Sequence, residues 1–177
     1  RNLDYIKRCV AVEGDTVLVE DGILKVNGEV YESNFADLDG DRYPELLMVG
    51  DYGTSRLFGN DGDGTFTDVT DESGVGDVTD HYGLGVVFAD VDDDADLDIF
   101  VANDSQANFL WRNDGDLRFE EIAAVAGVAT NEDAKEQAGM GADAADYDGD
   151  GRIDLVVTNF SHDWNTLHRN LGNATFL

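Results

Sequence analysis

The chain has 177 residues, of which 39 are acidic and 11 are basic, so its formal net charge is −28 at pH 7. This charge excludes the basic footprint needed to bind nucleic-acid phosphates or anionic membranes. Hydrophobic residues make up 42% of the sequence, so the chain is able to bury a core despite its acidity. No stretch comes near the roughly 20 consecutive apolar residues of a membrane helix, so we expect no membrane insertion.

Residues 1–33 are predicted to form a small antiparallel β-meander. Short β-prone runs are separated by turn sequences, and Asp21-Gly22 and Asn27-Gly28 are the clearest of these turns. The segment is also unusually basic, because Lys7, Arg8 and Lys25 lie within it. The chain begins with Arg1, so we expect a processed or trimmed product from which an export signal was removed.

The segment from Tyr5 to Tyr31, with its strings Y-I-K-R and D-G-I-L-K-V-N-G-E, resembles the core of bacterial type I signal peptidases. The resemblance implies that Lys7 corresponds to the general base of a serine/lysine protease. In that family the nucleophilic serine lies well upstream of the motif, whereas four residues precede Tyr5 here. A base without its nucleophile does not complete the catalytic pair, so we expect no enzyme activity, and a protease is the least favoured alternative.

Three sequence markers recur in phase between residues 34 and 177. The markers are an acidic D-x-D-x-D loop, an L-x-x-N-x-G string and a phenylalanine that follows the glycine turn. The loops start at Asp37, Asp90 and Asp146; the strings start at Leu57, Leu110 and Leu167; the phenylalanines are Phe66, Phe119 and Phe176. The agreement of three markers predicts three repeat units, which we call unit 1 (34–80), unit 2 (81–136) and unit 3 (137–177).

Each unit contains about four short β-prone runs in about 55 residues, which is typical of a propeller blade. The sequence therefore predicts an all-β fold, a β-propeller-like array of three four-stranded blades preceded by the meander. Short helical turns are expected between blades, at E-I-A-A-V-A-G-V and E-D-A-K-E-Q. Closed propellers usually have four or more blades. The meander could close the array, the chain could belong to a longer propeller, or neighbouring molecules could pair edge to edge.

The acidic loops are predicted to bind Ca²⁺, because they offer only oxygen ligands. Positions 1, 3, 5 and 9 supply carboxylates, and position 7 supplies a backbone carbonyl, so about three ions are expected. The predicted ligands are Asp37, Asp39, Asp41, Tyr43 and Glu45 in loop 1; Asp90, Asp92, Asp94, Asp96 and Asp98 in loop 2; and Asp146, Asp148, Asp150, Arg152 and Asp154 in loop 3. Acidic surface turns are the alternative, but three copies in phase favour calcium.

The three loops differ in glycine. Loop 3 has a glycine at positions 4 and 6, whereas loop 1 has Arg42 at position 6, followed by Pro44. Loop 2 has no glycine, so we expect it to be the most altered of the three. Trp111 and Trp164 are expected to pack between blades, although an exposed tryptophan in such an array would be able to bind sugar.

From residue 34 onward the chain resembles FG-GAP and VCBS-like repeats, which share A-D-x-D-x-D-G-x-x-D-L followed by L-x-x-N-x-G-x-G-x-F. Residues 66–75, F-T-D-V-T-D-E-S-G-V, match the tail of that pattern. The resemblance implies extracellular or cell-surface, calcium-stabilised propeller blades. We therefore expect a structural or adhesive protein that contacts other extracellular proteins or glycans, or that self-associates head to tail into a filament. The alternative is a propeller fragment that binds a glycan or protein ligand.

Overall fold

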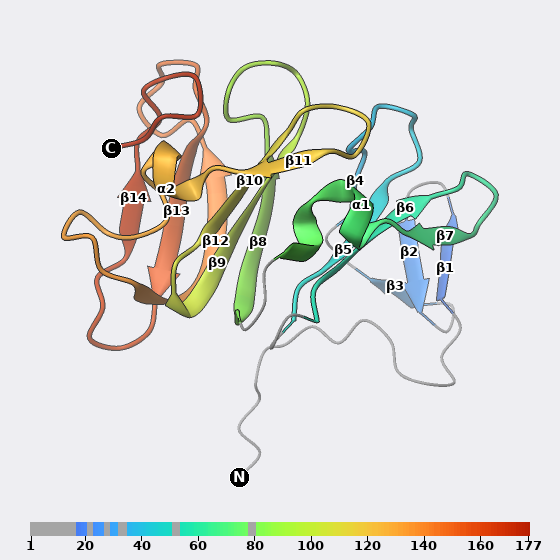
Figure 1. The fold of residues 1–177 in the computed structure, drawn as a ribbon, viewed down its shortest axis with the longest axis horizontal. Helices are drawn as coiled ribbons and strands as arrows, with labels where there is room; N and C mark the ends of the chain where they lie inside the picture. Colours follow the sequence, from blue (N-terminus) through green and yellow to red (C-terminus); the bar gives the residue numbers. More distant parts are fainter. Residues whose placement is uncertain (1–16, 21–22, 27–28, 32–34, 51–53, 78–80) are drawn as a thin grey trace, which may run out of the picture.

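The computed structural model describes residues 17–20, 23–26, 29–31, 35–50, 54–77 and 81–177. These residues form antiparallel sheets joined by single-turn helices (Figure 1), which confirms the predicted all-β class. They do not close into a propeller, so the blade arrangement and the number of blades stay predictions. Within the same residues no helix is long and apolar enough to cross a membrane.

The predicted meander is present as a three-stranded antiparallel sheet of its own. Strand β1 (Val17–Glu20) pairs with β2 (Ile23–Val26), and β2 pairs with β3 (Glu29–Tyr31). The two predicted turns, Lys7, and the rest of the Y-I-K-R segment lie outside the described residues. The order β1-β2-β3 is the simplest that short turns allow, because consecutive strands become neighbours.

Units 1 and 2 each contain the four strands that the sequence predicts, paired in chain order. In unit 3 three strands are followed by a single bridge between Asn170 and Phe176, so the predicted fourth strand is reduced to that bridge. The strands are β4 (Phe35–Ala36), β5 (Glu45–Met48), β6 (Arg56–Asn60) and β7 (Phe66–Asp68) in unit 1; β8 (Gly83–Ala89), β9 (Asp98–Gln106), β10 (Phe109–Asn113) and β11 (Phe119–Glu121) in unit 2; and β12 (Gln137–Ala145), β13 (Asp154–Asn159) and β14 (Thr166–His168) in unit 3.

Units 2 and 3 meet where the second strand of one pairs with the first strand of the other. The end of β9 pairs with the start of β12, so the strands of both units form one seven-stranded sheet. A Cβ atom on Gly85 would lie 2.6 Å from the backbone nitrogen of Ala142 and 2.8 Å from Gly141. Only a residue without a side chain allows β8 and β12 to come this close.

A single-turn helix follows the last strand of units 1 and 2 and touches the next unit. Helix α1 (Thr70–Ser73) ends at Gly74, and α2 (Ala123–Ala126) ends at Gly127; both glycines have left-handed φ angles, near 90°. A Cβ atom on Gly74 would lie 2.6 Å from the carbonyl oxygen of Phe119. The predicted helical turn at E-I-A-A-V-A-G-V is thus confirmed, whereas residues 132–137 form a turn and the start of β12.

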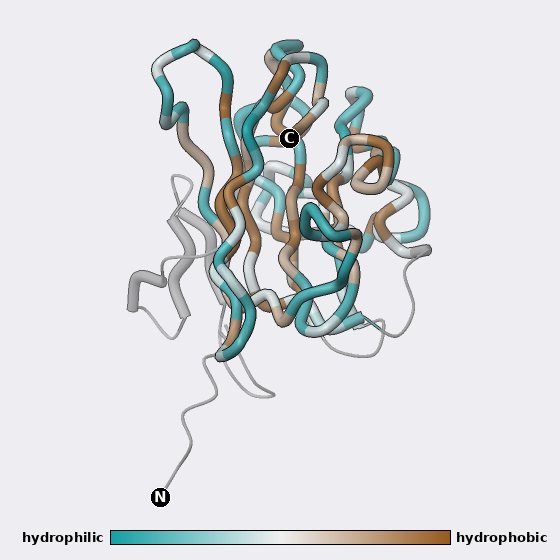
Figure 2. Tube along the Cα trace, turned by 90° about the vertical axis from the view of Figure 1, so that its left-hand side faces the viewer, coloured by the Kyte–Doolittle hydropathy of each residue, from teal (hydrophilic) through white to brown (hydrophobic). Residues whose placement is uncertain are grey.

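Among the residues whose burial is described, the hydrophobic core forms two clusters, each lying between consecutive units. One combines Leu38, Leu47 and Leu57 of unit 1 with residues of unit 2, and the other repeats this arrangement between units 2 and 3. Figure 2 shows hydrophobic stretches of the trace in the middle of the molecule and hydrophilic stretches at the loop ends above and below them. Trp111 is 2% exposed in the first cluster, as predicted, but Trp164 is 88% exposed on the loop after β13, so its predicted packing is wrong.

Candidate metal centres

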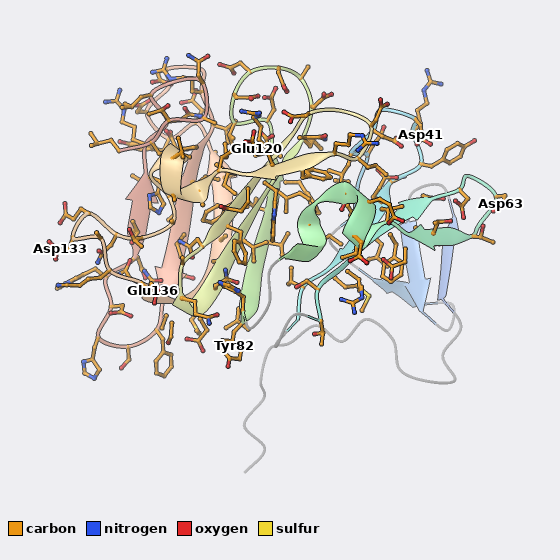
Figure 3. All side chains as sticks on the ribbon, viewed as in Figure 1. Asp41, Asp63, Tyr82, Glu120, Asp133 and Glu136 are labelled. Atoms are coloured by element: carbon orange, nitrogen blue, oxygen red, sulfur yellow. The ribbon has the colours of Figure 1, made fainter. Side chains whose placement is uncertain are left out.

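The three acidic loops occupy the same place in each unit. Each joins the first strand to the second, between β4 and β5, β8 and β9, and β12 and β13. The loops lie along one edge of the molecule, the upper edge in Figure 1, and Asp41 of loop 1 is labelled there in Figure 3. The chain therefore gathers three dense groups of negative charge on one side.

The loops also share one backbone conformation, including loop 2, which was expected to differ. Position 4 has a φ angle of 77° at Gly40, 66° at Asp93 and 77° at Gly149, all in the left-handed region. Position 6 is also left-handed, although it is Arg42 in loop 1 and Ala95 in loop 2. A left-handed residue other than glycine costs about 1 kcal/mol, so another interaction must hold these two loops in shape.

That interaction comes from the carboxylate at position 1. In loop 2 the Oδ1 atom of Asp90 accepts the N–H of Asp93 at 2.8 Å, and Oδ2 accepts the N–H of Ala95 at 3.0 Å. Asp37 and Asp146 accept the same two N–H groups in their own loops, at 2.7–3.1 Å. The aspartate at position 1 of each loop therefore stabilises the left-handed turn, including where positions 4 and 6 lack glycine.

The carboxylates at positions 1, 3 and 5 come together in loops 1 and 2. One oxygen atom from each lies within 4.8 Å of the others, in Asp37, Asp39 and Asp41 and in Asp90, Asp92 and Asp94. In loop 3 the group consists of Asp146, Asp148 and Asp154 instead. The ligation predicted for the carbonyl groups of Tyr43, Asp96 and Arg152 stays a prediction.

Partial burial and repulsion disfavour the ionised form of the carboxylate at position 3 in loops 1 and 2. Burial, together with repulsion from neighbouring loop carboxylates, raises the pKa of Asp39 and Asp92. The Oδ1 atom of Asp92 is buried without a hydrogen-bond partner among the described residues. By contrast, the N–H of Gly151 lowers the pKa of Asp146 in loop 3.

The carboxylate at position 9 is buried beneath each loop. Glu45 and Asp98 are 0% exposed and Asp154 is 2% exposed. In unit 2 the two oxygens of Asp98 accept the N–H of Val91 at 2.9 Å and the N–H of Asn113 at 2.8 Å. Burial raises the pKa of Glu45 and of Asp98 to about 7. A predicted ligand thus also links the loop to the third strand of its unit.

Sequence reasoning missed the asparagine of the L-x-x-N string, which connects consecutive units. The Nδ2 atom of Asn113 donates to the carbonyl of Leu38 in loop 1 at 2.7 Å, and that of Asn170 donates to Val91 in loop 2 at 2.8 Å. Asn113 also donates to Leu97 of its own unit at 3.2 Å. The recurrence of this asparagine in phase with the loops was the available signal.

Sequence reasoning also missed that the side chains of two arginines pair with carboxylates of loop 3. The Nε atom of Arg169 donates to Oδ2 of Asp148 at 2.7 Å, and the guanidinium of Arg152 pairs with Asp150. Arg152 also donates through Nε to the carbonyl of Asn170 at 3.0 Å. Loop 3 therefore has cationic side chains of the protein beside the carboxylates predicted to hold calcium.

Comparison with known proteins gives one family. The model of the FG-GAP-like repeat matches residues 37–101 and 90–157, so each match begins at an acidic loop and ends in the next unit. These two matches do not extend to residues 5–31, so the resemblance of that segment to signal peptidases stays a prediction.

Relatives that are similar to this chain in sequence include proteins named cartilage acidic protein 1. The mouse and human proteins are 36% identical over 140 residues, which is 79% of this chain, and the Xenopus tropicalis protein is 34% identical over 121 residues, or 67%. The chain spans about a fifth of the length of these relatives, between 18% and 20%.

Proposed function

The chain belongs to the FG-GAP-like repeat family, and we propose that it is a non-enzymatic, calcium-stabilised structural or adhesive module of the extracellular space. The observation that carries the proposal is the matching construction of the three loops. Loop 2 keeps the left-handed residues at positions 4 and 6 without any glycine. A simple acidic turn does not need this conformation three times, whereas a repeated cation site does.

The residues present fit calcium by their chemistry. Each loop offers oxygen donors, and the carboxylates converge to within 4.8 Å of one another. The buried and unpartnered Oδ1 atom of Asp92 is the kind of acceptor that a cation satisfies. Calcium would be held by the loop carboxylates and would remove their mutual repulsion, which fixes the first two strands of each unit relative to one another.

An extracellular location agrees with the charge and with the relatives. Exposed carboxylate loops suit the high calcium concentration outside cells, where modules bind with dissociation constants of about 10⁻⁴–10⁻³ M. The relatives are named for cartilage, a tissue made largely of extracellular matrix. Partners of this chain are therefore proposed to be other extracellular proteins or glycans, or further copies of itself in a head-to-tail assembly.

Calcium titration by calorimetry tests the proposal. We expect about three ions per chain, and we expect Asp94→Ala to remove one of them because Asp94 belongs to the converging set of loop 2. Glu132→Ala is the matched control, since Glu132 is an exposed acid outside the loops. Unchanged stoichiometry in Asp94→Ala, or equal melting temperatures with calcium and with chelator, would contradict the proposal.

A second candidate function is glycan or protein binding through the loop after β13. Trp164 is 88% exposed and Phe160 is 62% exposed on this loop. The carbonyl of Trp164 accepts the Nδ2–H of Asn159 at 2.7 Å, so the loop is anchored while its aromatic rings face solvent. Exposed aromatic rings of this kind stack on sugars and pack on proteins. Glycan-array binding that disappears in Trp164→Ala would support this function.

A further inference from the structure

The residue before the asparagine of the L-x-x-N string is an arginine in units 2 and 3, and Gly59 in unit 1. In unit 2 this residue is Arg112, and its Nη2 atom pairs with Asp114 at 2.9 Å and with Glu120 at 2.7 Å. Asp114 directly follows β10 and Glu120 lies on β11, so both acids belong to the hairpin that carries the arginine. The positive charge of Arg112 is therefore paired outside loop 2.

Unit 3 keeps the arginine but not the two acids. Leu171 and Leu177 stand at the positions of the acids that pair with Arg112 in unit 2. The guanidinium of Arg169 reaches loop 3 instead, where its Nε atom donates to Oδ2 of Asp148 at 2.7 Å. The replacement of the hairpin acids by leucines thus coincides with a change of partner, from the hairpin to the acidic loop.

The carboxylate at position 5 of loop 3 is also engaged by arginines. In all three loops the Oδ1 atom of this residue accepts the backbone N–H of position 7, at 2.7–3.0 Å. In loop 3 the Oδ2 atom of Asp150 pairs with the guanidinium of Arg152 and lies 3.7 Å from Nη2 of Arg169. Position 5 belongs to the converging carboxylates of loops 1 and 2, whereas position 9 takes its place in loop 3. Two carboxylates of loop 3 are therefore neutralised by cationic side chains of the protein itself.

Unit 2 shows this arginine position inside the array, with another unit packed behind it. The side chain of Arg112 is 33% exposed, and it lines a cavity together with Asp92 of loop 2 and Thr175 of unit 3. A following unit therefore leaves an arginine at this position beside the acidic loop of its own unit. The contact of Arg169 with loop 3 is in this respect a property of unit 3 alone.

We propose that Arg169, supported by Arg152, is an internal counter-ion that competes with calcium for loop 3 and sets the calcium affinity of this loop. The carboxylates of Asp148 and Asp150 must exchange these ion pairs for a bond to the cation, so loop 3 binds more weakly than its oxygen donors alone would allow. The exchange is feasible because the side chain of Arg169 is 44% exposed, and ion pairs at this exposure contribute little to stability. The inference deepens the proposed function and rests on it.

The experiment follows calcium binding at each loop by nuclear magnetic resonance of the full chain, isotope-labelled at the glycine nitrogens. Gly149 and Gly151 report on loop 3 and Gly40 reports on loop 1, because each donates its N–H to the aspartate at position 1 of its loop. Arg169→Ala is expected to lower the calcium concentration at the midpoint of the loop 3 signals about tenfold. The midpoint of Gly40 is expected to move far less.

The variant and its control are matched in charge. Arg169→Ala keeps the two backbone hydrogen bonds of this residue with Leu177, at 2.9 Å, and unit 1 has Gly59 at the same position, so we expect the fold to be retained. Lys135→Ala is the control, because Lys135 pairs with Asp133 at 3.4 Å, and Figure 3 shows Asp133 away from the edge that carries the loops. Arg169→Lys keeps the charge and is expected to stay close to the natural midpoint.

The outcomes separate this inference from the proposed function. An unchanged loop 3 midpoint in Arg169→Ala, or an equal shift in Lys135→Ala, would overturn the inference while calcium binding itself stands. Glycine signals that do not respond to calcium in either loop would overturn the proposed function.

A second variant moves the arginine instead of removing it. Leu171→Asp introduces the acid that units 1 and 2 have at this position, Asp61 and Asp114, and thereby offers Arg169 a partner outside loop 3. Because Leu171 is 49% exposed, the substitution places the new carboxylate at the surface. We expect Leu171→Asp to lower the loop 3 midpoint in the natural chain and to have little effect in Arg169→Ala. An equal shift in both backgrounds would show that the added charge acts without the arginine, and would overturn the inference.

Discussion

The side chain of Asn113 donates a hydrogen bond to Leu38 of unit 1, whereas the bonds of Asn60 lie within unit 1. We therefore predict that removing the side chain of Asn113 destabilises the protein more than removing that of Asn60. The perturbation is Asn113→Ala, and the matched control is Asn60→Ala. Asn113 is 0% exposed, and its amide donates to Leu38 and Leu97 while its oxygen accepts the N–H of Gly115 at 3.0 Å. The substitution removes all three bonds and leaves their partners without this residue's side chain.

The magnitude follows from the difference between the two sites. Asn60 is half-buried and makes two of the three bonds, to the carbonyl of Pro44 and from the N–H of Gly62. A buried polar group left without its partner costs about 1–3 kcal/mol. We therefore expect the free energy of unfolding to fall by about 3–5 kcal/mol in Asn113→Ala, and by about 2 kcal/mol less in Asn60→Ala.

Urea unfolding in calcium, followed by circular dichroism, measures both values. Equal free energies of unfolding for the two variants would refute the reasoning, since they would show that the bond to Leu38 adds nothing. A larger loss in Asn60→Ala would refute it as well. The denaturant slope of each variant should match that of the natural chain, because both substitutions leave the surface exposed on unfolding almost unchanged.

Two further predictions concern strand contact and pH. Gly85→Ala should lower the free energy of unfolding by about 2 kcal/mol by chemical denaturation, because its Cβ would lie 2.6 Å from Ala142; Gly59→Ala is the control, with its nearest contact at 3.4 Å. Burial lowers the pKa of His168 from 6.5 to about 4. As pH falls, the imidazole of His168 is therefore protonated in the unfolded chain before it is protonated in the folded chain. This group contributes about 3 kcal/mol to the free energy of unfolding above pH 6.5, and the contribution is lost as pH falls towards 4. His168→Phe introduces the residue type that unit 1 has at the same position, Phe58. The melting temperature of this variant should fall less between pH 6.5 and pH 4 than that of the natural chain. An equal fall in melting temperature for the two proteins would contradict the prediction.

The convergence of the loop carboxylates could be predicted from sequence because these residues are local. All carboxylates of one loop lie within nine residues, so spacing alone brings them together once the strands on either side pair. The repeat register was predictable for a similar reason, since Leu57 and Leu110 recur at equivalent points of their strands. The antiparallel pairing of each unit then follows from short connections.

The contacts between units could not be predicted, because their partners are far apart in sequence. The bond from Asn113 to Leu38 spans 75 residues, and that from Asn170 to Val91 spans 79. Nothing in the spacing of either residue indicates which carbonyl its amide reaches. Loop 2 was expected to be altered for a related reason: the missing glycine was visible, but the two N–H groups that Asp90 holds were not.

The asparagine at the same position of units 2 and 3 joins the acidic loops to one another. In unit 2 the backbone N–H of Asn113 binds Asp98 beneath loop 2, while its side chain binds the carbonyl of Leu38 in loop 1. In unit 3 the N–H of Asn170 binds Asp154 and its side chain binds Val91 in loop 2. A cation that orders one loop therefore also fixes the group that holds the neighbouring loop. Because the loops share these links, we expect calcium binding along the array to be cooperative rather than independent, with a Hill coefficient above one in the calcium titration.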